Sequence, residues 1–498
     1  MRKRILFWLC LTLTFTLWAN VSGQVRATQA KKKYNVLFLF ADDQRKDTIH
    51  ALGNEHIHTP TLDALVKKGT FFSRAYIQGS MSGAVCMPSR AMLMSGRTLF
   101  RAPMQLNGVS LLGETLQKAG YVTCGIGKWH NGAPSFLRSF HMGPTVMLGG
   151  MSDHFNVPTS RIGKKRKMEK FDAKGKHSSE LFADAAVDFL KNQVGKKQNK
   201  GKPFFLYVAF TAPHDPRDAP QKYRDMYYKK RPPLPKNFLP QHPFNNGHMV
   251  LRDENLAAWP RQKETVRDQL AEYYALITHL DAQISRILQA LEDSGEMDNT
   301  IIIYTADHGL AVGSHGLLGK QSIYDHSVGT PLIFVGPGIP RNEQRDALVY
   351  LYDLFPTICD MNSVAIPESV EGTSIKGIIN GDQKSIRKDL YFNYRHLMRG
   401  MRDDQYKLIC YPKIAHVQLF DLKNDPHEMT NLAKDKGHAK RIAQMKARVL
   451  AWEKQLGLKE MPLAVANPMP KEIDLSGKGR KPDRWQPDWI VQKYFKTK

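Results

Sequence analysis

The sequence has little cysteine and no internal repeat, and both absences narrow the choice of architecture. Five cysteines in 498 residues are too few for a disulfide-stabilised scaffold. A chain of this length exceeds what one ordinary hydrophobic core covers, because cores stop growing near ~250–300 residues. Hydrophobic residues make up 42% of the chain and charged residues 24%, which is typical of globular proteins and excludes general disorder. We therefore expect one large domain and one smaller domain.

Long apolar runs are missing after the first twenty or so residues. Three basic residues at positions 2–4 precede the apolar stretch Ile5–Ala19, and the small residues of Val21–Gly23 offer a cleavage site. This order is typical of a secretory signal peptide. The alternative is a membrane anchor, but the apolar stretch is shorter than the ~20 residues that a transmembrane helix needs. We predict that residues 1–23 are removed, that the protein is periplasmic or secreted, and that it has no stable membrane anchor.

Acidic residues are outnumbered, with 47 Asp and Glu against 72 Lys and Arg, and the net charge of +25 favours polyanionic partners. Two basic runs stand out, at Lys164–Lys167 and at residues 196–202. They are interpreted first as solvated loop charges, and recruitment of an anionic polymer is the alternative. No nucleic-acid-binding fold is recognisable, and export removes the opportunity, so no nucleic acid partner is expected.

Short, continuous apolar runs predict buried parallel strands at residues 35–40, 121–126, 204–210 and 300–305, with a fifth at 331–335. Helical patterns lie between them. Strands that alternate with helices predict an α/β fold, with a large and mostly parallel sheet sandwiched by helices.

The longest helical pattern runs from Leu270 to Leu291, and Gly295 follows it as a stop signal. Two stretches without periodicity, residues 161–176 and 229–247, are predicted as loops. The second of them carries five prolines. We assign the α/β pattern to a large domain of residues 34–385.

The composition changes after about residue 385, which predicts a smaller C-terminal α+β subdomain of residues 386–498. A helix is expected at about 437–456. Antiparallel strands rich in aromatic residues are expected at residues 390–394, 406–411 and 417–420.

Ionisable residues follow each of the four clearest strands. They are Asp42 and Asp43 after the first, Lys128 and His130 after the second, His214 after the third, and Asp307 and His308 after the fourth. Sites in open parallel sheets form beyond the carboxyl ends of the strands, so these groups are expected to meet. Converging carboxylates suggest a divalent cation, and oxygen ligands favour Ca²⁺ or Mg²⁺ over zinc. Taken alone, an Asp-Asp pair after a strand is more often a turn or a helix cap. Their convergence makes a metal site an equally good explanation.

Cys86 is the most informative residue of the chain. Pro88 is well placed early in a helix, and Ala91–Met94 favours helix. Cys86 is therefore predicted at a helix N-terminus beside Arg90. The helix N-terminus and the arginine both lower the pKa of a thiol. The alternative is a buried structural cysteine.

Cys86-Met-Pro-Ser-Arg90 resembles the Cys-x-Pro-Ser-Arg motif of the type I sulfatases, which belong to the alkaline phosphatase superfamily. Residues 120–130 resemble the second signature of that family. Met87 and Ser95 depart from the usual residues without touching the core of the motif. The resemblance covers residues 34–457. Further similar stretches occur in the family's order at residues 41–45, 58–63, 212–214, 306–309, 316–320 and 420–426.

The resemblance implies an alkaline phosphatase-like fold and a sulfate ester hydrolase. In this family a maturation enzyme oxidises the motif cysteine to formylglycine (3-oxoalanine), so Cys86 would be the precursor of the nucleophile and a metal ligand. The hydrated aldehyde would attack sulfur, and collapse of the sulfated intermediate would release sulfate. The family precedent implies one Ca²⁺ per chain rather than Mg²⁺, held with Asp42, Asp43, Asp307 and His308.

The same resemblance implies roles for the other motif residues. Arg90 would pair with the hydrated aldehyde and the metal-binding carboxylates. Lys128 and Lys320 would bind sulfate oxygens. His130 would be the base for the collapse step, and either His214 or Lys320 would protonate the leaving oxygen.

A sulfated carbohydrate is the substrate we expect. One alternative is a phosphoester or phosphonate monoester hydrolase, since related enzymes share the nucleophile motif. Another is a non-catalytic polyanion-binding protein, which would not need that motif. Asp153 and His154 are weak candidates for one further polar side chain in the site. Whether Cys124, Cys359 and Cys410 form any disulfide is left open.

Overall fold

The computed structural model describes residues 32–173, 175–479, 481–482, 486 and 488–496. The predicted signal peptide lies outside the described residues. Residues 33–498 form one compact unit. No helix in the described ranges is long and apolar enough to cross a membrane. Their four cysteines are free and buried.

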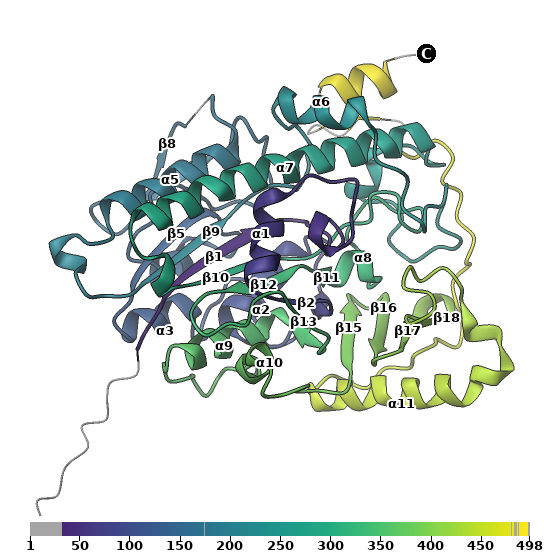
Figure 1. Cartoon of the computed structure of the whole chain (residues 1–498). Coiled ribbons are helices and arrows are strands. Elements are labelled where there is room, and N and C mark those ends of the chain that lie inside the picture. Colours follow the sequence, from purple (N-terminus) through teal and green to yellow (C-terminus); the bar gives the residue numbers. More distant parts are fainter. Residues whose placement is uncertain (1–31, 174, 480, 483–485, 487, 497–498) are drawn as a thin grey trace, which may run out of the picture. The chain divides into compact units, whose positions relative to one another are not determined.

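A ten-stranded sheet runs through this unit in the order β13-β2-β12-β10-β1-β9-β5-β6-β7-β8 (Figure 1). Its four central strands are parallel to one another, and they confirm the four clearest sequence predictions. They are β10 (Thr300–Ala306), β1 (Asn35–Ala41), β9 (Phe204–Ala209) and β5 (Val122–Lys128). All residues of β1, β9 and β10 are buried, which explains their unbroken apolar sequence.

Strand register brings the ends of these strands together. Ala41 at the end of β1 lies opposite Ala306 at the end of β10, and Ala209 of β9 lies opposite Gly127 of β5. The residues that follow therefore leave the sheet at a common edge.

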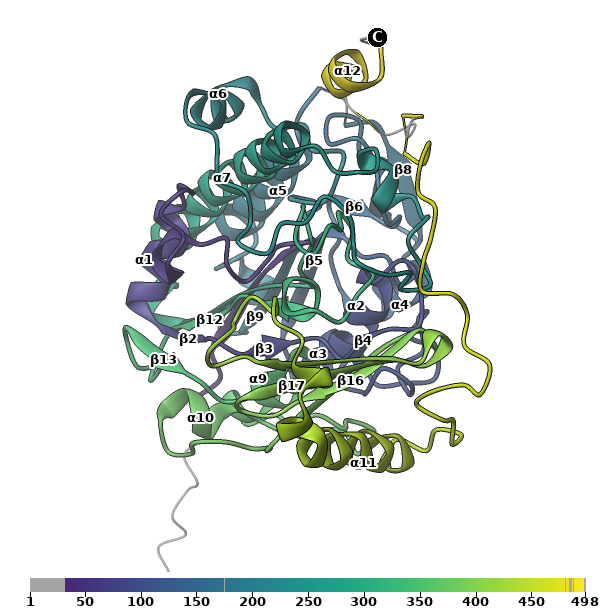
Figure 2. The ribbon, with the colours of Figure 1, turned by 90° about the vertical axis from the view of Figure 1, so that its right-hand side faces the viewer.

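Helices cover both faces of the sheet (Figures 1 and 2). Alternate residues of β1 belong to the cores on opposite sides of it. Val36, Phe38 and Phe40 join a core with α2, α3, α4 and α9, whereas Leu37 and Leu39 join a core with α1, α5 and α7. The bounds are α1 (Pro60–Lys68), α2 (Cys86–Ser95), α3 (Leu112–Lys118), α4 (Ala133–Ser139), α5 (Ser178–Asn192), α7 (Lys263–Asp293) and α9 (Leu354–Met361).

Two sequence predictions for the large sheet are wrong. The run at residues 331–335 forms β12 (Leu332–Val335), which is antiparallel to β10 rather than parallel. A strand buried on both faces reads alike in either direction, so the apolar pattern carries no information on orientation. The predicted loop at 161–176 contains an antiparallel hairpin of β7 (Thr159–Ile162) and β8 (Met168–Phe171). Its exposed charged side chains hide the strand pattern.

The other predicted loop is confirmed. Between α6 (Gln221–Lys229) and a 3-10 helix at Asp253–Leu256, residues 230–252 contain no helix or strand, apart from one bridge between Phe238 and Ser314. Further strands and α-helices are β2 (Thr70–Phe72), β3 (Ala75–Tyr76), β6 (Val146–Met147), β11 (Gly329–Thr330), β13 (Glu343–Arg345), β14 (Val349–Tyr350), α8 (Asp325–Val328), α10 (Lys376–Asn380) and α12 (Asp488–Ile490).

A second sheet has the order β18-β17-β16-β15-β4, and α11 (Ala439–Gln455) packs against it (Figure 2). Its antiparallel strands are β15 (Leu390–Tyr394), β16 (Met398–Arg402), β17 (Tyr406–Tyr411) and β18 (His416–Asp421). The edge strand β4 (Gly79–Ser80) comes from the N-terminal part of the chain, just before Cys86, and pairs in parallel with β15. Gly79 permits this approach, because a Cβ there would lie 1.9 Å from the carbonyl oxygen of Asn393.

The chain after α11 runs back along the ribbon to α12 (Figures 1 and 2). It contacts the long connection between α6 and α7 at several points. Lys471 O accepts from Asn245 N at 2.6 Å, Lys478 O accepts from Trp259 N at 3.4 Å, and Gln486 donates to Leu256 O at 3.0 Å. The C-terminal segment thus supports a loop that has little regular structure of its own.

Replacing Gly479 by Ala should lower the melting temperature more than replacing Gly477. Both glycines have positive φ, 66° and 73°, so the left-handed backbone costs an Ala about 1–2 kcal/mol at either position. A Cβ at Gly479 would also lie 2.6 Å from Ala257 O, whereas one at Gly477 would have nothing within 4 Å. Thermal melts of the two variants test this packing. Equal decreases would contradict it.

Candidate active site

The common edge of the central strands carries a buried acidic cluster. Asp42 and Asp43 follow β1, Asp307 and His308 follow β10, and all four side chains are fully buried. Asp43 adopts a left-handed backbone with φ of 65°, and its N–H donates to Asp307 Oδ1 at 3.0 Å. The register of β1 and β10 therefore places these two pairs side by side, as predicted.

Cys86 is the first residue of α2 and is buried, with 2% of its surface exposed. Its Sγ lies 3.2 Å from Nδ1 of His130, which follows β5. Gly150 leaves room for this ring, since a Cβ at position 150 would lie 2.3 Å from His130 Nε2. The pKa of His130 is lowered to about 3 by burial and by the charges of Lys128 and Arg90. His130 is therefore neutral at neutral pH, and one of its ring nitrogens is a hydrogen-bond acceptor.

Arg90 joins α2 to the ends of the strands. Its Nε donates to Asp307 Oδ2 at 3.0 Å, and its Nη1 donates to Lys128 O at 2.9 Å. The guanidinium also lies over the Phe40 ring at 4.8 Å. Burial alone would lower the pKa of Arg90, but Asp307 and other nearby groups outweigh burial and raise it. The arginine is therefore permanently charged.

Each carboxylate of the cluster has a basic partner. Lys128 Nζ donates to Asp42 Oδ2 at 2.5 Å, Lys320 Nζ donates to both oxygens of Asp43 at 2.8 Å, and Arg90 pairs with Asp307. The charge of the carboxylates is thus balanced within the protein. Charge compensation by itself no longer requires a metal ion, so the case for a cation must rest on individual atoms.

Two buried acceptor atoms fit a cation. Asp42 Oδ1 and His308 Nε2 have no hydrogen-bond partner in the described part of the chain. His308 Nδ1 lies 2.9 Å from Gly309 O, and His308 Nε2 lies 3.2 Å from Asp43 Oδ1. A positive charge, either a ring proton or a bound cation, would stabilise this contact between Nε2 and the carboxylate.

The donor atoms also have suitable spacing. Ligand atoms of Asp42, Cys86, Asp307 and His308 all lie within 4.8 Å of one another, so these residues could hold a divalent ion. Asp43, the fifth predicted ligand, falls in a second group with His214 and Asp215. Two of these four donors are carboxylate oxygens, one is a ring nitrogen and one is a sulfur, so the set suits a divalent cation without selecting one.

His214 and Lys320 form a pair beside this cluster. Lys320 Nζ lies 3.0 Å from His214 Nε2, and His214 Nδ1 lies 2.6 Å from Asp215 O. Burial and the charge of Lys320 hold the pKa of His214 well below its ordinary value. Neutral His214 therefore accepts a hydrogen bond from Lys320 and can relay its proton.

The two weaker sequence candidates support the site from outside. His154 Nε2 donates to His214 O at 2.9 Å, and His154 Nδ1 lies 2.8 Å from Ser178 Oγ. The carboxylate of Asp153 accepts from two following backbone N–H groups. Neither side chain lines the pocket described next.

A cavity of about 430 Å³ opens over Cys86, and His130, His214 and Lys320 line it. Sequence reasoning missed its outer wall, which includes Met151, His248, Arg252, Asp253 and Arg395. Three of these come from the proline-rich connection before α7, whose length alone signalled a functional loop. No sequence signal marks Arg395, because it reaches the pocket from the second sheet.

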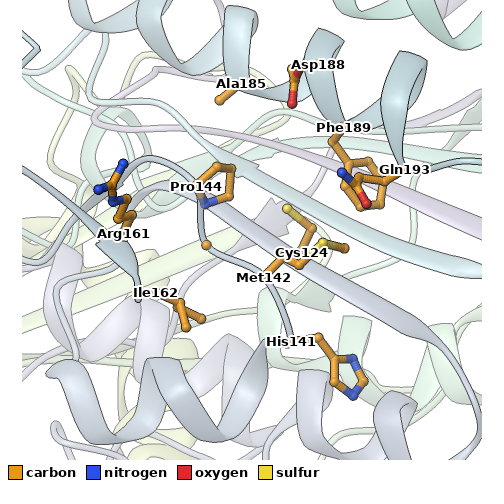
Figure 3. A pocket seen from close by; sticks show the side chains of 11 residues that line it. Cys124, His141, Met142, Pro144, Arg161, Ile162, Ala185, Asp188, Phe189 and Gln193 are labelled. Atoms are coloured by element: carbon orange, nitrogen blue, oxygen red, sulfur yellow. The ribbon is translucent and has the colours of Figure 1, made fainter. Parts of the chain in front are cut away.

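A second pocket, of about 340 Å³, lies against α5, β5 and β7 (Figure 3). Cys124, Met142 and Phe189 line it together with Arg161 and Asp188. It contains none of the predicted site residues. Burial raises the pKa of Cys124, so its thiol stays protonated and is a poor nucleophile.

Comparison with known proteins identifies the class. The family model for Sulfatase matches residues 34–363, more than half of the chain, and the model for the N-sulphoglucosamine sulphohydrolase C-terminal region matches residues 313–455. The chain therefore belongs to the sulfatase family and is a sulfate ester hydrolase.

Two characterised relatives are similar over most of their length. An arylsulfatase of Clostridium perfringens is 29% identical over 466 residues, covering 82% of this chain and 92% of the relative. An N-acetylglucosamine-6-O-sulfatase of Bacteroides thetaiotaomicron is 25% identical over 510 residues, covering 85% of this chain and 87% of the relative.

Solved structures share the fold. A protein in complex with its substrate D-glucosamine-2-N,6-O-disulfate superposes with a TM-score of 0.73 at 23% identity, covering 86% of this chain and 98% of that chain. A phosphonate monoester hydrolase of Agrobacterium radiobacter superposes with a TM-score of 0.69 at 22% identity, covering 85% of this chain and 96% of that chain. The predicted alkaline phosphatase-like fold is confirmed, with antiparallel strands toward the edges of its parallel centre.

Calcium should raise the melting temperature of the wild type and should do so far less in Asp42→Asn. A ligand that binds only the folded state stabilises it by ~2.7 kcal/mol at a hundred times its dissociation constant. Asp42 Oδ1 is one of the two acceptors without a hydrogen bond, and Asp42→Asn removes the carboxylate charge that would bind the ion, so the variant should weaken that effect.

Calorimetry of chelator-treated protein, with and without added CaCl₂, measures the shift. Asp153→Asn is the matched control, because this carboxylate caps backbone N–H groups outside the cluster. An equal calcium shift in Asp42→Asn and wild type, or zinc as the stoichiometric metal, would contradict the assignment.

Proposed function

We propose that this protein is an exported sulfatase that removes sulfate esters from a sulfated glycan, with Cys86 converted to formylglycine by a maturation enzyme and one Ca²⁺ in the acidic cluster. The observation that carries the proposal is the position of Cys86. It begins a helix, faces the pocket, and lies 3.2 Å from a neutral histidine beside the cluster.

The formylglycine would supply a hydrated aldehyde whose hydroxyl attacks sulfur. The chain's own residues prepare this step. The N-terminus of α2 favours negative charge at position 86. His130 Nδ1 is close enough to take a proton from a group there. Arg90, one turn after Cys86, fixes the helix against Asp307, which keeps position 86 beside the cluster.

Proton delivery to the leaving oxygen is assigned to the pair of His214 and Lys320. Both line the pocket, and Lys320 donates toward His214 Nε2 at 3.0 Å. Lys320 and Lys128 would also exchange their carboxylate partners for sulfate oxygens, which adds positive charge where the transition state gains negative charge.

A sulfated hexosamine is the substrate class we infer. The relatives that act on N-acetylglucosamine 6-sulfate or bind glucosamine disulfate support it, as does a cavity of about 430 Å³, within the usual size of ligand pockets. The net charge of +25 suits an anionic polymer. Within the basic run, the Arg166 guanidinium keeps its charge but already donates hydrogen bonds to the carbonyl oxygens of Leu137, Phe140 and His141.

Co-expression with a formylglycine-generating enzyme should convert Cys86. Its peptide should lose one sulfur and two hydrogens and gain one oxygen, which intact-mass analysis detects. Cys86→Ala should abolish turnover and keep the melting temperature. Cys124→Ala is the control, because this equally buried cysteine lies in the second pocket. Full activity in protein whose Cys86 is verified as unmodified would overturn the proposed mechanism.

Phosphonate hydrolysis is the second candidate function, favoured only by the shared fold of the phosphonate hydrolases. Side-by-side rates on 4-nitrophenyl sulfate, 4-nitrophenyl phosphate and phenyl 4-nitrophenyl phosphonate separate the two. We expect kcat/KM for the sulfate to exceed the other values at least about tenfold, a difference of ~1.4 kcal/mol in transition-state binding. A higher value for the phosphonate would assign the second function.

A further inference from the structure

Arg395 occupies a rigid turn between β15 and β16. Its φ of 50° is a left-handed conformation that residues other than glycine seldom adopt. Three hydrogen bonds hold the turn: Arg395 N donates to Ser80 O at 2.7 Å, Asn393 Nδ2 donates to Arg395 O at 2.7 Å, and Leu397 N donates to Tyr394 O at 3.1 Å. Backbone strain of this kind persists where surrounding contacts fix it, and it often occurs at ligand sites.

Ser80, which accepts the hydrogen bond from Arg395 N, lies just before the segment that leads to Cys86. Ser80 ends β4, pairs with Tyr394 of β15, and is followed along the chain by the segment that leads to Cys86. The second sheet is therefore hydrogen-bonded to the segment that carries Cys86. This connection fixes the turn of Arg395 relative to the floor of the pocket.

The side chain of Arg395 is exposed and lines the same cavity as Cys86. Other basic side chains of that cavity already contact carboxylates: Lys320 pairs with Asp43, and Arg252 pairs with Asp215 and Asp253. Within the described residues, the Arg395 guanidinium forms no ion pair with a carboxylate, and its side chain forms a hydrogen bond with Tyr394. A positive charge without a protein counter-ion thus faces the mouth of the pocket.

His248 lies beside this arginine. Its ring stacks on the Tyr394 ring with 5.8 Å between the ring centroids, and its Nδ1 lies 2.7 Å from the Tyr394 hydroxyl oxygen. Burial and the charge of Arg395 lower the pKa of His248, so the ring is neutral at neutral pH and does not add a second positive charge. The arginine supplies the charge of this wall, and the histidine supplies a fixed polar edge.

We propose that Arg395, with His248 beside it, forms a second anion subsite that binds a sulfate or carboxylate group on the same substrate molecule whose sulfate ester reaches Cys86. A guanidinium offers paired N–H donors that match both groups. The inference rests on the proposed function and adds that the enzyme selects sugars with two anionic groups over sugars with one.

Three probes test the subsite: N-acetylglucosamine 6-sulfate, glucosamine 2-N,6-O-disulfate, and a 6-sulfated glucosamine linked to glucuronic acid. Wild type should show a kcat/KM at least about tenfold higher for one of the two doubly anionic probes, as expected for a charge-assisted contact. Which of them is preferred separates sulfate from carboxylate as the second group.

Arg395→Asn should remove most of this preference, and Arg395→Lys should retain part of it. Asn tolerates the left-handed backbone, so the turn should survive, and equal melting temperatures verify this. Arg341→Gln is the control, since it removes an exposed positive charge that does not line the cavity and should leave the ratio of kcat/KM values unchanged.

Binding measured in the Cys86→Ala background separates this inference from the reaction itself. Calorimetry should show weaker binding of the preferred probe when Arg395→Asn is added, by about tenfold. A wild type without preference, or an Arg395→Asn variant that retains it, overturns the subsite. A wild type that hydrolyses no sulfate ester while its Cys86→Ala form still binds through Arg395 overturns the proposed function alone.

Discussion

The buried ion pair between Arg90 and Asp307 is the interaction on which the site depends. Neither side chain is exposed, and the pair joins α2 to the residue that follows β10. Removing one partner of such a pair typically costs about 3–5 kcal/mol, because the other is left as a buried unpaired charge. Cys86 begins this helix one turn before Arg90, so the location of the nucleophile position depends on this contact.

Paired charges surround that contact and give the site its adaptability. Asp42 with Lys128 and Asp43 with Lys320 are fully or almost fully buried, where an ion without a partner would be very costly. The same groups can exchange partners, the lysines for an anionic ester and the carboxylates for a cation, without leaving any ion unpaired. Asp42 Oδ1 and His308 Nε2, which have no hydrogen-bond partner in the described residues, mark the position at which a cation would bind.

Each feature that was predicted wrongly or missed from the sequence has a physical reason. β12 was assigned the wrong direction because its two buried faces read the same either way. The β7–β8 hairpin was missed because it is short, lies at the edge and carries exposed charges. Arg395 and His248 were missed because nothing in their local sequence distinguishes a side chain at a pocket wall from one in solvent.

The sequence by itself determined the central strands, the start of α2 at Cys86, and the acidic residues beyond β1 and β10, because buried parallel strands need unbroken apolar runs and their sites lie at a common edge. Only the tertiary structure decided which charges pair and which segments meet over the pocket. Lys320, His248 and Arg395 come from three distant segments, and the pairing of β4 with β15 links one of these segments to Cys86. Such proximity depends on packing between elements, and local sequence patterns do not record it.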